Sequence, residues 1–493
     1  MGKKEDKHEN KQFQKIIAHA KEYGFVFPSS EIYDGLQAVY DYGSNGVELK
    51  NKLKQFWWKS MTQMHENIVG IDSAIFMHPT IWKASGHVDS FNDPMVDNKD
   101  SNKRYRADVL IEDKAAEYEK AGDKAKADAL LKKMGELLDA EDLAGVKELI
   151  ENEEIVCPLS GTANWTDVRQ FNLMFDTQLG STADGASSIY LRPETAQGIF
   201  VNFLNVQKTA RQKIPFGIAQ IGKAFRNEIV ARQFIFRMRE FEQMEMQFFV
   251  RPGEEMEHYE AWKEQRMKWH KILGTADDKL RFHDHEKLAH YANAACDIEY
   301  EFPFGFKEVE GIHSRTDFDL IQHQKFSKKK QQYFDTVVNK NYVPYVVETS
   351  IGADRLFLLM LSNAYTEAEG VDNKGNAKIR TFLKFPPALA PVQAAVLPVV
   401  KKDGLAEIGR EVFNLLKFDF KVIYEEQQGI GKRYTRQDLI GTPYCIAVDH
   451  QTKEDNTVTV RDRDTTEQIR MPIDALAAYL GERVSMNSLL RQL

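Results

Sequence analysis

The chain has 493 residues, of which 42% are hydrophobic and 28% charged, and its formal net charge is −8. This composition is that of a globular protein and excludes a disordered or fibrous chain, and the length is enough for about three ordinary domains. No apolar run approaches the roughly 18 residues of a membrane span, so we expect no membrane association. The negative charge means that any contact with RNA must come from local basic patches.

The first 15 residues, Met1 to Lys15, are rich in Lys, Glu, Asp and Asn and have no apolar core, which is typical of neither a signal peptide nor a transit peptide. The only cysteines are Cys157, Cys296 and Cys445, far apart in the sequence. This spacing argues against a disulfide framework and for a reducing compartment. We therefore expect a cytoplasmic protein.

Residues 13–63 predict a helix, a short loop and a second helix, with a turn-rich link at 41–46. Apolar residues recur at near-helical spacing in the second helix: Val47, Leu49, Leu53, Phe56, Trp57 and Met61. A short strand is predicted within 68–76. Residues 112–153 are almost entirely Ala, Lys, Glu, Asp and Leu, which predicts a charged helical hairpin inserted at about 110–155. Its exposed face either meets only water or contacts RNA.

Residues 189–354 predict one large antiparallel sheet that carries helices, and the proline-rich stretch 381–391 predicts a domain boundary. We therefore expect a first domain over 1–388 and a second over 389–493. The second domain alternates strands and helices and is predicted to be α/β. Its expected strands are 394–400, 421–424, 444–448 and 457–461, and its expected helices are 405–416, 434–440 and 473–480.

The stretch Ile218 to Val250 predicts two strands joined by a loop at 229–235, with Arg226 and Glu228 on one face of the first strand. One face of the second strand carries Arg237, Arg239, Phe241, Gln243, Glu245 and Gln247. The other face is apolar apart from Glu240 and Glu242. Guanidinium groups suit phosphate, a phenyl ring can stack on a base and carboxylates can hold an ammonium group. From the pattern alone, a salt-bridged sheet surface is the alternative.

This arrangement, Phe225-Arg226-x-Glu228, a loop and Arg237-x-x-x-Phe241-x-x-x-Glu245, resembles motif 2 of the class II aminoacyl-tRNA synthetases. The resemblance implies that Arg226 holds the α-phosphate of ATP and that Phe241 stacks on adenine. It also implies that Glu228 and a loop arginine contact the adenine and the γ-phosphate end.

Two further stretches are similar to motifs of the same family. Tyr345 to Met360 resembles motif 3, in which Gly352 would let the backbone approach the nucleotide and Arg355 would meet the γ-phosphate. The stretch 43–58 resembles motif 1, the helix through which the family dimerises, although any amphipathic core helix has a similar pattern.

Four stretches are similar to the glycyl-tRNA synthetases within this class. They are Leu191 to Gly198 (Leu-Arg-Pro-Glu-Thr-Ala-Gln-Gly), Phe241 to Glu245, Glu308 to Ile312 with Arg315, and Glu348 to Ser350. The resemblance implies a pocket in which carboxylates grip the ammonium group of glycine and an arginine takes its carboxylate. Larger amino acids would be rejected by steric clash in a rigid pocket.

Carried over residue by residue, the resemblance implies two sets of contacts and gives Arg226 and Arg355 the catalytic roles. The predicted glycine contacts are Arg106, Glu194, Phe241, Glu242, Gln243, Met244, Glu245, Arg315, Glu348, Thr349, Ser350, Ile351 and Gly352. The predicted ATP contacts are Arg226, Asn227, Glu228, Phe236, Arg237, Met238, Arg239, Glu240, Phe241, Glu308, Val309, Gly352, Ala353, Asp354 and Arg355, with Glu308 also a candidate Mg²⁺ ligand.

The family chemistry would be in-line attack of the glycine carboxylate on the α-phosphate of ATP, which forms glycyl-adenylate and releases pyrophosphate. The terminal ribose hydroxyl of the tRNA would then take the glycyl group. Such sites act by positioning and charge neutralisation, so no nucleophilic side chain is expected. The stretches 431–444 and 458–464 resemble the anticodon-binding domain of the glycyl, prolyl, threonyl and histidyl enzymes. Arg461 and Arg463 would contact the anticodon, or they are solvated surface charges.

A zinc site is not expected. His283, His285 and His290 lack the usual spacing and a fourth ligand, and Cys157 is followed by Ser160 where some relatives carry a second cysteine. We thus predict an α+β class II catalytic domain and an α/β anticodon-binding domain in a cytoplasmic homodimer that uses ATP, Mg²⁺, glycine and tRNA(Gly). The alternatives are a synthetase for serine or proline, or a non-catalytic tRNA-binding relative.

Overall fold

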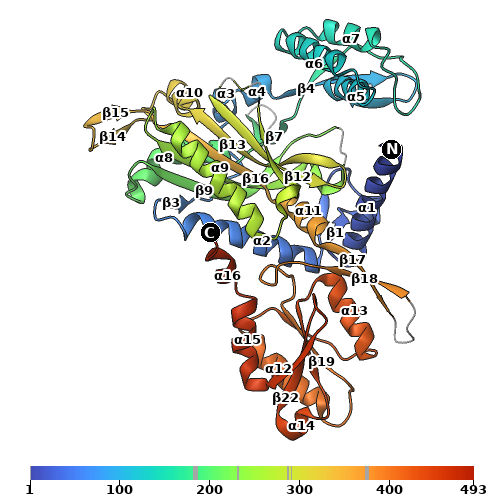
Figure 1. The fold of residues 1–493 in the computed structure, drawn as a ribbon. Helices are drawn as coiled ribbons and strands as arrows, with labels where there is room; N and C mark the ends of the chain where they lie inside the picture. The colour runs from blue at the N-terminus through green and yellow to red at the C-terminus, as the bar shows by residue number, and fades with distance from the viewer. Residues whose placement is uncertain (1, 181–186, 230–232, 286–287, 290, 372–376) are drawn as a thin grey trace. The chain divides into compact units, whose positions relative to one another are not determined.

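The computed structural model describes residues 2–180, 187–229, 233–285, 288–289, 291–371 and 377–493. The chain forms two compact units. Figure 1 labels most of their helices and strands. The first unit comprises Met1–Ser73, Thr195–Lys223 and Phe241–Leu493, and the second comprises Ala74–Glu194 and Ala224–Glu240.

The first unit is built on a seven-stranded sheet of order β11-β12-β13-β16-β10-β9-β3. Its strands are β3 (Ile68–Gly70), β9 (Phe216–Phe225), β10 (Glu240–Val250), β11 (Leu280–Asp284), β12 (Ala294–Phe302), β13 (Gly305–Thr316) and β16 (Tyr345–Gly352). The pairs from β11 to β10 are antiparallel, which confirms the predicted antiparallel sheet, whereas β3 runs parallel to β9.

Helices and small hairpins surround this sheet. The helices are α1 (Gly2–Glu22), α2 (Ser44–Thr62), α8 (Ala196–Thr209), α9 (Glu255–Ile272), α10 (Phe318–Ser327) and α11 (Ala353–Ala364), with 3-10 turns at Glu31–Tyr33 and Asp277–Lys279. The hairpins are β1 (Val26–Pro28) with β2 (Tyr40–Tyr42), β14 (Tyr333–Asp335) with β15 (Lys340–Tyr342), and β17 (Tyr365–Val371) with β18 (Ala377–Leu383). The predicted apolar positions of α2 are buried except Val47, which is 42% exposed. Phe56 of α2 stacks on Trp269 of α9 at 5.4 Å, so these two helices share a core.

The C-terminal part of the first unit has a five-stranded sheet of order β20-β19-β21-β22-β23. Its elements are β19 (Ala394–Pro398), α12 (Leu405–Leu416), β20 (Val422–Tyr424), α13 (Ile430–Ile440), β21 (Tyr444–Val448), α14 (Thr452–Asp455), β22 (Thr457–Asp462), β23 (Gln468–Pro472), η4 (Ile473–Ala475), α15 (Leu476–Arg483) and α16 (Met486–Leu490). The predicted α/β alternation is confirmed. The sequence analysis did not predict β23, a strand of five residues at the edge of the sheet in which no side chain is fully buried.

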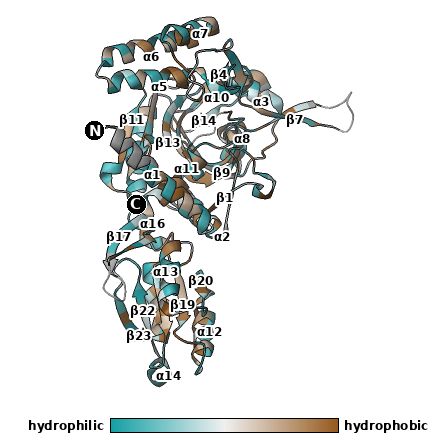
Figure 2. Cartoon of the chain, turned by 90° about the vertical axis from the view of Figure 1, so that its right-hand side faces the viewer, coloured by the Kyte–Doolittle hydropathy of each residue, from teal (hydrophilic) through white to brown (hydrophobic). Residues whose placement is uncertain are grey.

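The second unit contains α3 (Pro79–Ala84), α4 (His87–Ser90), β4 (Asn92–Asn98), β5 (Lys103–Arg106), α5 (Ala107–Lys120), α6 (Lys124–Asp139), α7 (Leu143–Asn152), β6 (Arg169–Asn172), β7 (Phe175–Leu179), β8 (Ser187–Leu191) and η2 (Phe234–Phe236). The prediction of a helical hairpin is wrong in the number of helices. A hairpin has two helices, whereas this stretch forms three, α5, α6 and α7. The third helix starts where the Asp142 side chain accepts a hydrogen bond from Gly145 N at 2.9 Å. Hydrophobic residues alternate with hydrophilic ones along these helices (Figure 2) and pack around Leu110, Leu130 and Val146.

Among the described residues, the helices include none with the length and apolar composition needed to cross a membrane.

Candidate active site

One face of the large sheet gathers the polar residues that were predicted to bind glycine. In the register of β10 with β16, Glu245 lies opposite Ser350 and Gln247 lies opposite Glu348. In the register of β13 with β16, His313 also lies opposite Glu348. Side chains that are direct cross-strand partners point to the same face of a sheet. Three adjacent strands therefore present Glu245, Gln247, Glu348, Ser350 and His313 together.

Glu348 accepts hydrogen bonds from three side chains. Its carboxylate accepts hydrogen bonds from Gln247 Nε2 at 2.6 Å, His313 Nδ1 at 2.8 Å and Arg315 Nη1 at 3.1 Å. Burial would raise the pKa of Glu348, but Arg315, His313 and Gln247 outweigh burial and hold the pKa well below its usual range. The carboxylate is therefore kept charged at neutral pH.

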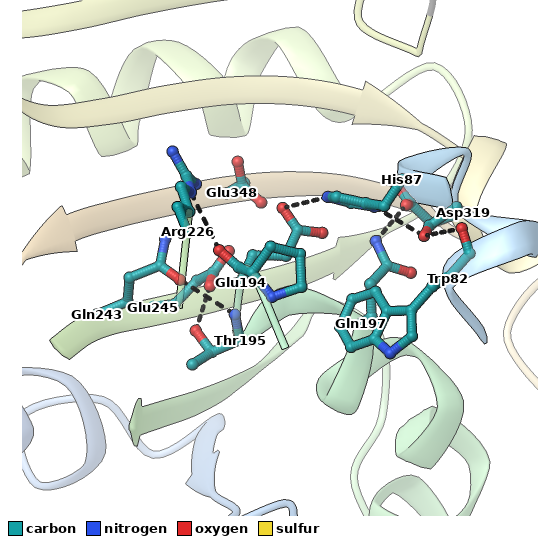
Figure 3. Close-up of polar contacts among 12 residues, drawn as sticks. Trp82, His87, Glu194, Thr195, Gln197, Arg226, Gln243, Glu245, Asp319 and Glu348 are labelled. Carbon is teal, nitrogen blue, oxygen red and sulfur yellow. Dashed lines mark hydrogen bonds and ion pairs between the residues drawn. The ribbon is translucent and has the colours of Figure 1, made fainter. Parts of the chain in front are cut away.

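Glu245 lies beside Glu348 and is linked to it through Gln247, whose Nε2 also donates to Glu245 Oε1 at 3.0 Å. The other oxygen of Glu245 accepts a hydrogen bond from the Thr195 hydroxyl, and the Thr195 backbone NH donates to Gln243 Oε1 at 3.1 Å (Figure 3). Thr195 follows Glu194 in the Arg-Pro-Glu-Thr motif. The motif thus supplies a side chain that holds one of the predicted pocket carboxylates.

Arg315 is fixed by partners that sequence reasoning did not find. Its guanidinium donates to both oxygens of Asp319 in α10 at 2.9 and 3.0 Å, in addition to Glu348. The side-chain nitrogen of Gln197 in α8 donates to Asp319 at 3.0 Å, and its side-chain oxygen accepts a hydrogen bond from His323 Nε2 at 2.8 Å. All four side chains are almost completely buried. The only sequence signal was Gln197, which belongs to the Arg-Pro-Glu-Thr-Ala-Gln-Gly stretch.

The predicted contacts Glu242 and Asp354 lie on the opposite side of the sheet from Glu245. Lys50 of α2 lies 2.8 Å from Glu242 Oε2 and 2.5 Å from Asp354 Oδ1, and Lys54 lies 3.0 Å from Glu242 Oε1. Asp354 also accepts the Tyr42 hydroxyl and the Glu242 backbone NH. These carboxylates therefore join α2 to β10 and α11. Three further predicted contacts, Met244, Thr349 and Ile351, are fully buried in the sheet.

A register shift places Glu308 on the polar face. In the pairing of β12 with β13, Ile298 lies opposite Glu310, and the next residue of β12, Glu299, lies opposite Glu308. Val309 therefore has no cross-strand partner, as in a β-bulge. Glu310 is buried on the other side against Arg266 and His270, at 2.6 and 2.8 Å. Glu308 pairs with Arg355 at 2.9 Å. The two residues predicted to meet the far end of ATP are thus brought together, next to Gly352 and Ala353 at the start of α11.

The motif 2 arginines belong to the second unit and lie just outside the strands. The expected strands are too long here, because β9 ends at Phe225 and β10 starts at Glu240. Arg226 and Arg239 are nevertheless joined by a hydrogen bond from the Arg226 NH to the Arg239 carbonyl at 2.9 Å. Arg226 Nε donates to Pro193 O at 3.2 Å, and its guanidinium lies 5.4 Å from the Phe91 ring centre.

The other predicted residues of the second unit have protein partners. Arg237 lies 3.7 Å from Glu228, and Arg239 Nε donates to the Glu228 carbonyl at 2.9 Å. Glu194 lies 3.6 Å from His87 (Figure 3). Arg106 pairs with Asp108 at 2.5 Å and Asp93 at 3.2 Å. The Asn227 NH donates to Leu173 O at 2.8 Å, and Phe236 and Met238 are buried. Loop residues 230–232 lie outside the described part of the chain.

Arg461 and Arg463, the predicted anticodon contacts, are both buried. Arg461 forms two hydrogen bonds with Asp438 of α13 at 2.9 and 3.1 Å. Arg463 donates to the carbonyls of Gly441 and Phe385, each at 2.8 Å, and to Asp464 at 2.7 Å. The structure thus gives both arginines structural partners, and their contact with RNA stays a prediction.

The histidines and cysteines considered for zinc have other partners. His285 lies 2.8 Å from Asp297, and His283 lies 3.7 Å from Glu299, while His290 falls outside the described residues. Cys157 is a hydrogen-bonding partner of the Tyr105 hydroxyl at 3.2 Å. Within the described ranges, no group of three or more His, Cys, Asp or Glu side chains is arranged to hold a metal ion.

Comparison with known proteins places this geometry in a family. Residues 177–364 match the tRNA synthetase class II core domain (G, H, P, S and T), residues 93–173 match the glycyl-tRNA synthetase insertion domain 1, and residues 393–483 match the anticodon binding domain. The glycine–tRNA ligase of Chlorobaculum tepidum is 53% identical over 472 residues, which cover 95% of this chain and 99% of the relative. The chain belongs to the glycyl-tRNA synthetases.

Other relatives agree with this assignment. The glycine–tRNA ligase of Staphylococcus haemolyticus is 53% identical over 477 residues, which cover 96% of this chain and 99% of that protein. Among solved structures, the prolyl-tRNA synthetase of Cryptosporidium parvum aligns with a TM-score of 0.59 at 13% identity, covering 97% of this chain and 76% of the other. This last similarity supports the class II fold alone.

Proposed function

We propose that this chain joins glycine to the 3′ end of tRNA(Gly) at the expense of ATP, through a glycyl-adenylate. Membership of the glycyl-tRNA synthetases supports the reaction. The observation that carries the amino-acid choice is the pair of carboxylates, Glu245 and Glu348, held by one amide on a buried sheet face.

Two carboxylates suit the ammonium group of glycine, which offers three N–H donors, and glycine has no side chain to recognise. Ser350 lies opposite Glu245 and adds a hydroxyl group on the same face. The strands behind these groups are packed, since Met244, Thr349 and Ile351 are fully buried. A larger amino acid would have to displace groups that are already fixed by hydrogen bonds, so exclusion is favoured by steric clash.

Arg226 and Arg355 are assigned to ATP, Arg226 to the α-phosphate and Arg355 to the γ-phosphate. A guanidinium group can donate two parallel hydrogen bonds to phosphate oxygens and stays charged. Glu308, which pairs with Arg355 at 2.9 Å, offers carboxylate oxygens of the kind that Mg²⁺ prefers. Bound Mg²⁺ would neutralise phosphate charge. The protein groups then position the glycine carboxylate for attack and hold the developing charge.

A cytoplasmic homodimer is part of this proposal. Large hydrophobic side chains are exposed just before α2, among them Ile32 (88%), Tyr33 (80%) and Leu36 (55%). Exposed apolar patches of this kind are typical of protein–protein interfaces. The segment precedes the helix that resembles motif 1, so a second copy of this chain is the occupant that we assign. We further propose domains over 1–388 and 389–493, the second for anticodon binding.

The reaction is tested by ATP–pyrophosphate exchange with glycine, alanine, serine and proline in parallel. Exchange with glycine alone supports the proposal. Exchange with serine or proline would instead indicate a synthetase for another small amino acid, and exchange with none would indicate a tRNA-binding protein without this activity. Arg226→Ala should abolish exchange and leave tRNA binding in place, whereas Arg483→Ala, at an exposed arginine of α15, should leave exchange unchanged.

A further inference from the structure

A cluster of positive charge lies at the β14–β15 end of the first unit. Four lysines are exposed at and after the end of α10: Lys325, Lys328, Lys329 and Lys330. Lys340 is exposed on β15 of the hairpin that follows, and Lys208, Arg211 and Lys213 are exposed at and after the end of α8. We call these eight residues the basic surface.

The two groups of cations flank a single hydrophobic core. Leu204 and Val206 of α8, Leu320 of α10, and Tyr333 and Tyr342 of the hairpin belong to one packed cluster. Figure 1 draws β14 and β15 beside α10 and α8, in agreement with that packing. The two groups of cations therefore lie on elements that pack around one core, although they come from separate parts of the sequence.

Acidic side chains do not neutralise this surface. No residue from Ala196 to Phe216 is acidic, and the stretch that starts at Asp317 and ends at Val343 contains only three acidic residues, Asp317 included. Two of these are buried and form ion pairs with arginines outside the basic surface. Asp319 pairs with Arg315, and Asp335 pairs with Arg251 at 2.6 Å. Within the described part of the chain, none of the eight cations of the basic surface forms an ion pair. This local excess of positive charge stands out in a chain whose net charge is −8.

Exposed apolar side chains lie among the lysines. Phe326 at the end of α10 is 41% exposed, Phe334 of β14 is 49% exposed and Val337 at the turn is 79% exposed. A groove or face that combines lysines with exposed aromatic rings is typical of RNA-binding proteins, because the lysines track the phosphate backbone and the rings can contact bases or ribose. Charge that only served solubility would not need exposed phenyl rings beside it.

We propose that the basic surface binds the phosphate backbone of tRNA. The proposal rests on the proposed function for the identity of the RNA, and its physical basis is the unpaired positive charge. Because lysines contact phosphates without reading bases, the surface would add affinity and a steep salt dependence and would not select the tRNA by sequence.

The test compares the full-length chain with the triple variant Lys328→Gln, Lys329→Gln and Lys330→Gln. The dissociation constant for a tRNA(Gly) transcript is measured by fluorescence anisotropy between 50 and 200 mM salt. The triple variant should bind about tenfold or more weakly at low salt, and its plot of log affinity against log salt should be shallower by up to about 3, since each lost phosphate contact removes roughly one unit of slope. Glycine-dependent ATP–pyrophosphate exchange without tRNA should be unchanged.

A matched control replaces three exposed but dispersed lysines, Lys11, Lys21 and Lys83, by glutamine. This variant has the same change of net charge and should keep the tRNA affinity and salt slope of the parent. Equal affinity and equal slope for the Lys328–Lys330 variant and the parent would overturn the proposal.

Two other results are informative. If the Lys328–Lys330 variant lost binding to phosphatidylserine vesicles but kept its tRNA affinity, the basic surface would be a membrane contact and the proposal would be wrong. If the parent failed to exchange with glycine while the Lys328–Lys330 variant lost tRNA affinity, the basic surface would stand and the proposed function would fall.

Discussion

Gln247 lies between the two carboxylates that we assign to the ammonium group of glycine. Its amide nitrogen donates to Glu245 and to Glu348, and its side chain is completely buried. Two buried carboxylates at this separation repel each other, and one of them would take up a proton unless donors compensate both. The amide of Gln247 therefore donates a hydrogen bond to each carboxylate and fixes their spacing.

Replacing this amide by a group of similar shape without a donor tests its role. We expect Gln247→Met to raise KM for glycine about tenfold, because loss of a hydrogen bond to a charged group costs roughly 1.5–3 kcal/mol. KM for ATP should stay within about twofold. Both constants are measured by ATP–pyrophosphate exchange.

The matched control is Gln220→Met. Gln220 is also completely buried, on the neighbouring strand β9, and its side-chain oxygen accepts the Ser73 NH at 3.1 Å. This substitution should lower the free energy of unfolding and leave the ratio of KM for glycine to KM for ATP unchanged. A KM for glycine that changed no more in Gln247→Met than in the control would show that Gln247 only fills space.

His313 should make stability depend on pH. Burial would lower the pKa of His313, but Glu348 outweighs burial and raises it above the ordinary value of 6.5. Protonation of His313 therefore stabilises the folded chain. This contribution is fully present below about pH 6.5 and is lost as the pH rises through the raised pKa of the folded state.

The measurement is the urea midpoint of unfolding between pH 5.5 and 9 for the parent and for His313→Asn. Because the pKa of His313 is raised in the folded chain, we expect the free energy of unfolding of the parent to fall toward that of the variant as the pH rises. His450→Asn, at an exposed histidine of the C-terminal part, is the control. Parallel midpoints for the parent and His313→Asn at every pH would contradict this assignment.

At the residue scale, sequence motifs identified Glu245, Glu348 and Ser350, and the structure gathers these on one face. The motifs could not identify Gln247 and His313 as partners of Glu348, because cross-strand register depends on pairing across 101 and 35 residues of sequence. For Arg461, the sequence could not show whether the side chain is buried. A surface arginine and a buried arginine look the same in sequence, and only the contact with Asp438 distinguishes them.

Helix α2 contributes a buried cation that links separate elements. Lys50 is almost fully buried and pairs with Glu242 of β10 and Asp354 of α11. Burial would lower the pKa of Lys50, but Asp354 and Glu242 outweigh burial and raise it. The helix that resembles motif 1 is thereby tied to the strand of motif 2 and the helix of motif 3.

Lys50→Met should destabilise the chain by about 3–5 kcal/mol, because removal of one partner leaves buried carboxylates without compensation. Lys54, whose side chain is 24% exposed, pairs with the same Glu242. Lys54→Met should cost no more than about 1 kcal/mol, as for a more accessible ion pair. The two free energies of unfolding are compared by urea denaturation. Equal losses for the two variants would mean that the buried ion pairs are not what ties α2 to the sheet.

Among the elements, helices with apolar residues repeated at helical spacing could be predicted from the sequence, whereas the ends of strands could not. The pattern of Leu49, Leu53 and Trp57 located α2 within a few residues. In contrast, β9 and β10 end before the motif 2 arginines, and the register shift at Val309 separates Glu308 from Glu310. Alternation in the sequence assumes a regular strand, so a bulge reverses the predicted face of every residue beyond it.

At the scale of the whole molecule, the exposed apolar segment before α2 predicts the oligomeric state. We expect the double substitution Ile32→Asp and Tyr33→Asp to convert a dimer to a monomer, since two carboxylates in an apolar interface carry a large desolvation cost. Sedimentation velocity measures the change. The same substitutions in an exposed apolar pair elsewhere, Val337→Asp and Val338→Asp, should leave the dimer intact. A parent that sediments as a monomer would contradict the dimer.

Glu245 and Glu348 are the two groups that we assign to the ammonium group of glycine. The most direct test is a crystal structure of the full chain with a non-hydrolysable glycyl-adenylate analogue. We expect the ammonium nitrogen to lie about 3 Å from oxygens of both carboxylates, within hydrogen-bonding distance. An ammonium group bound away from both, with Gln247 still bridging them and no ligand between, would contradict it.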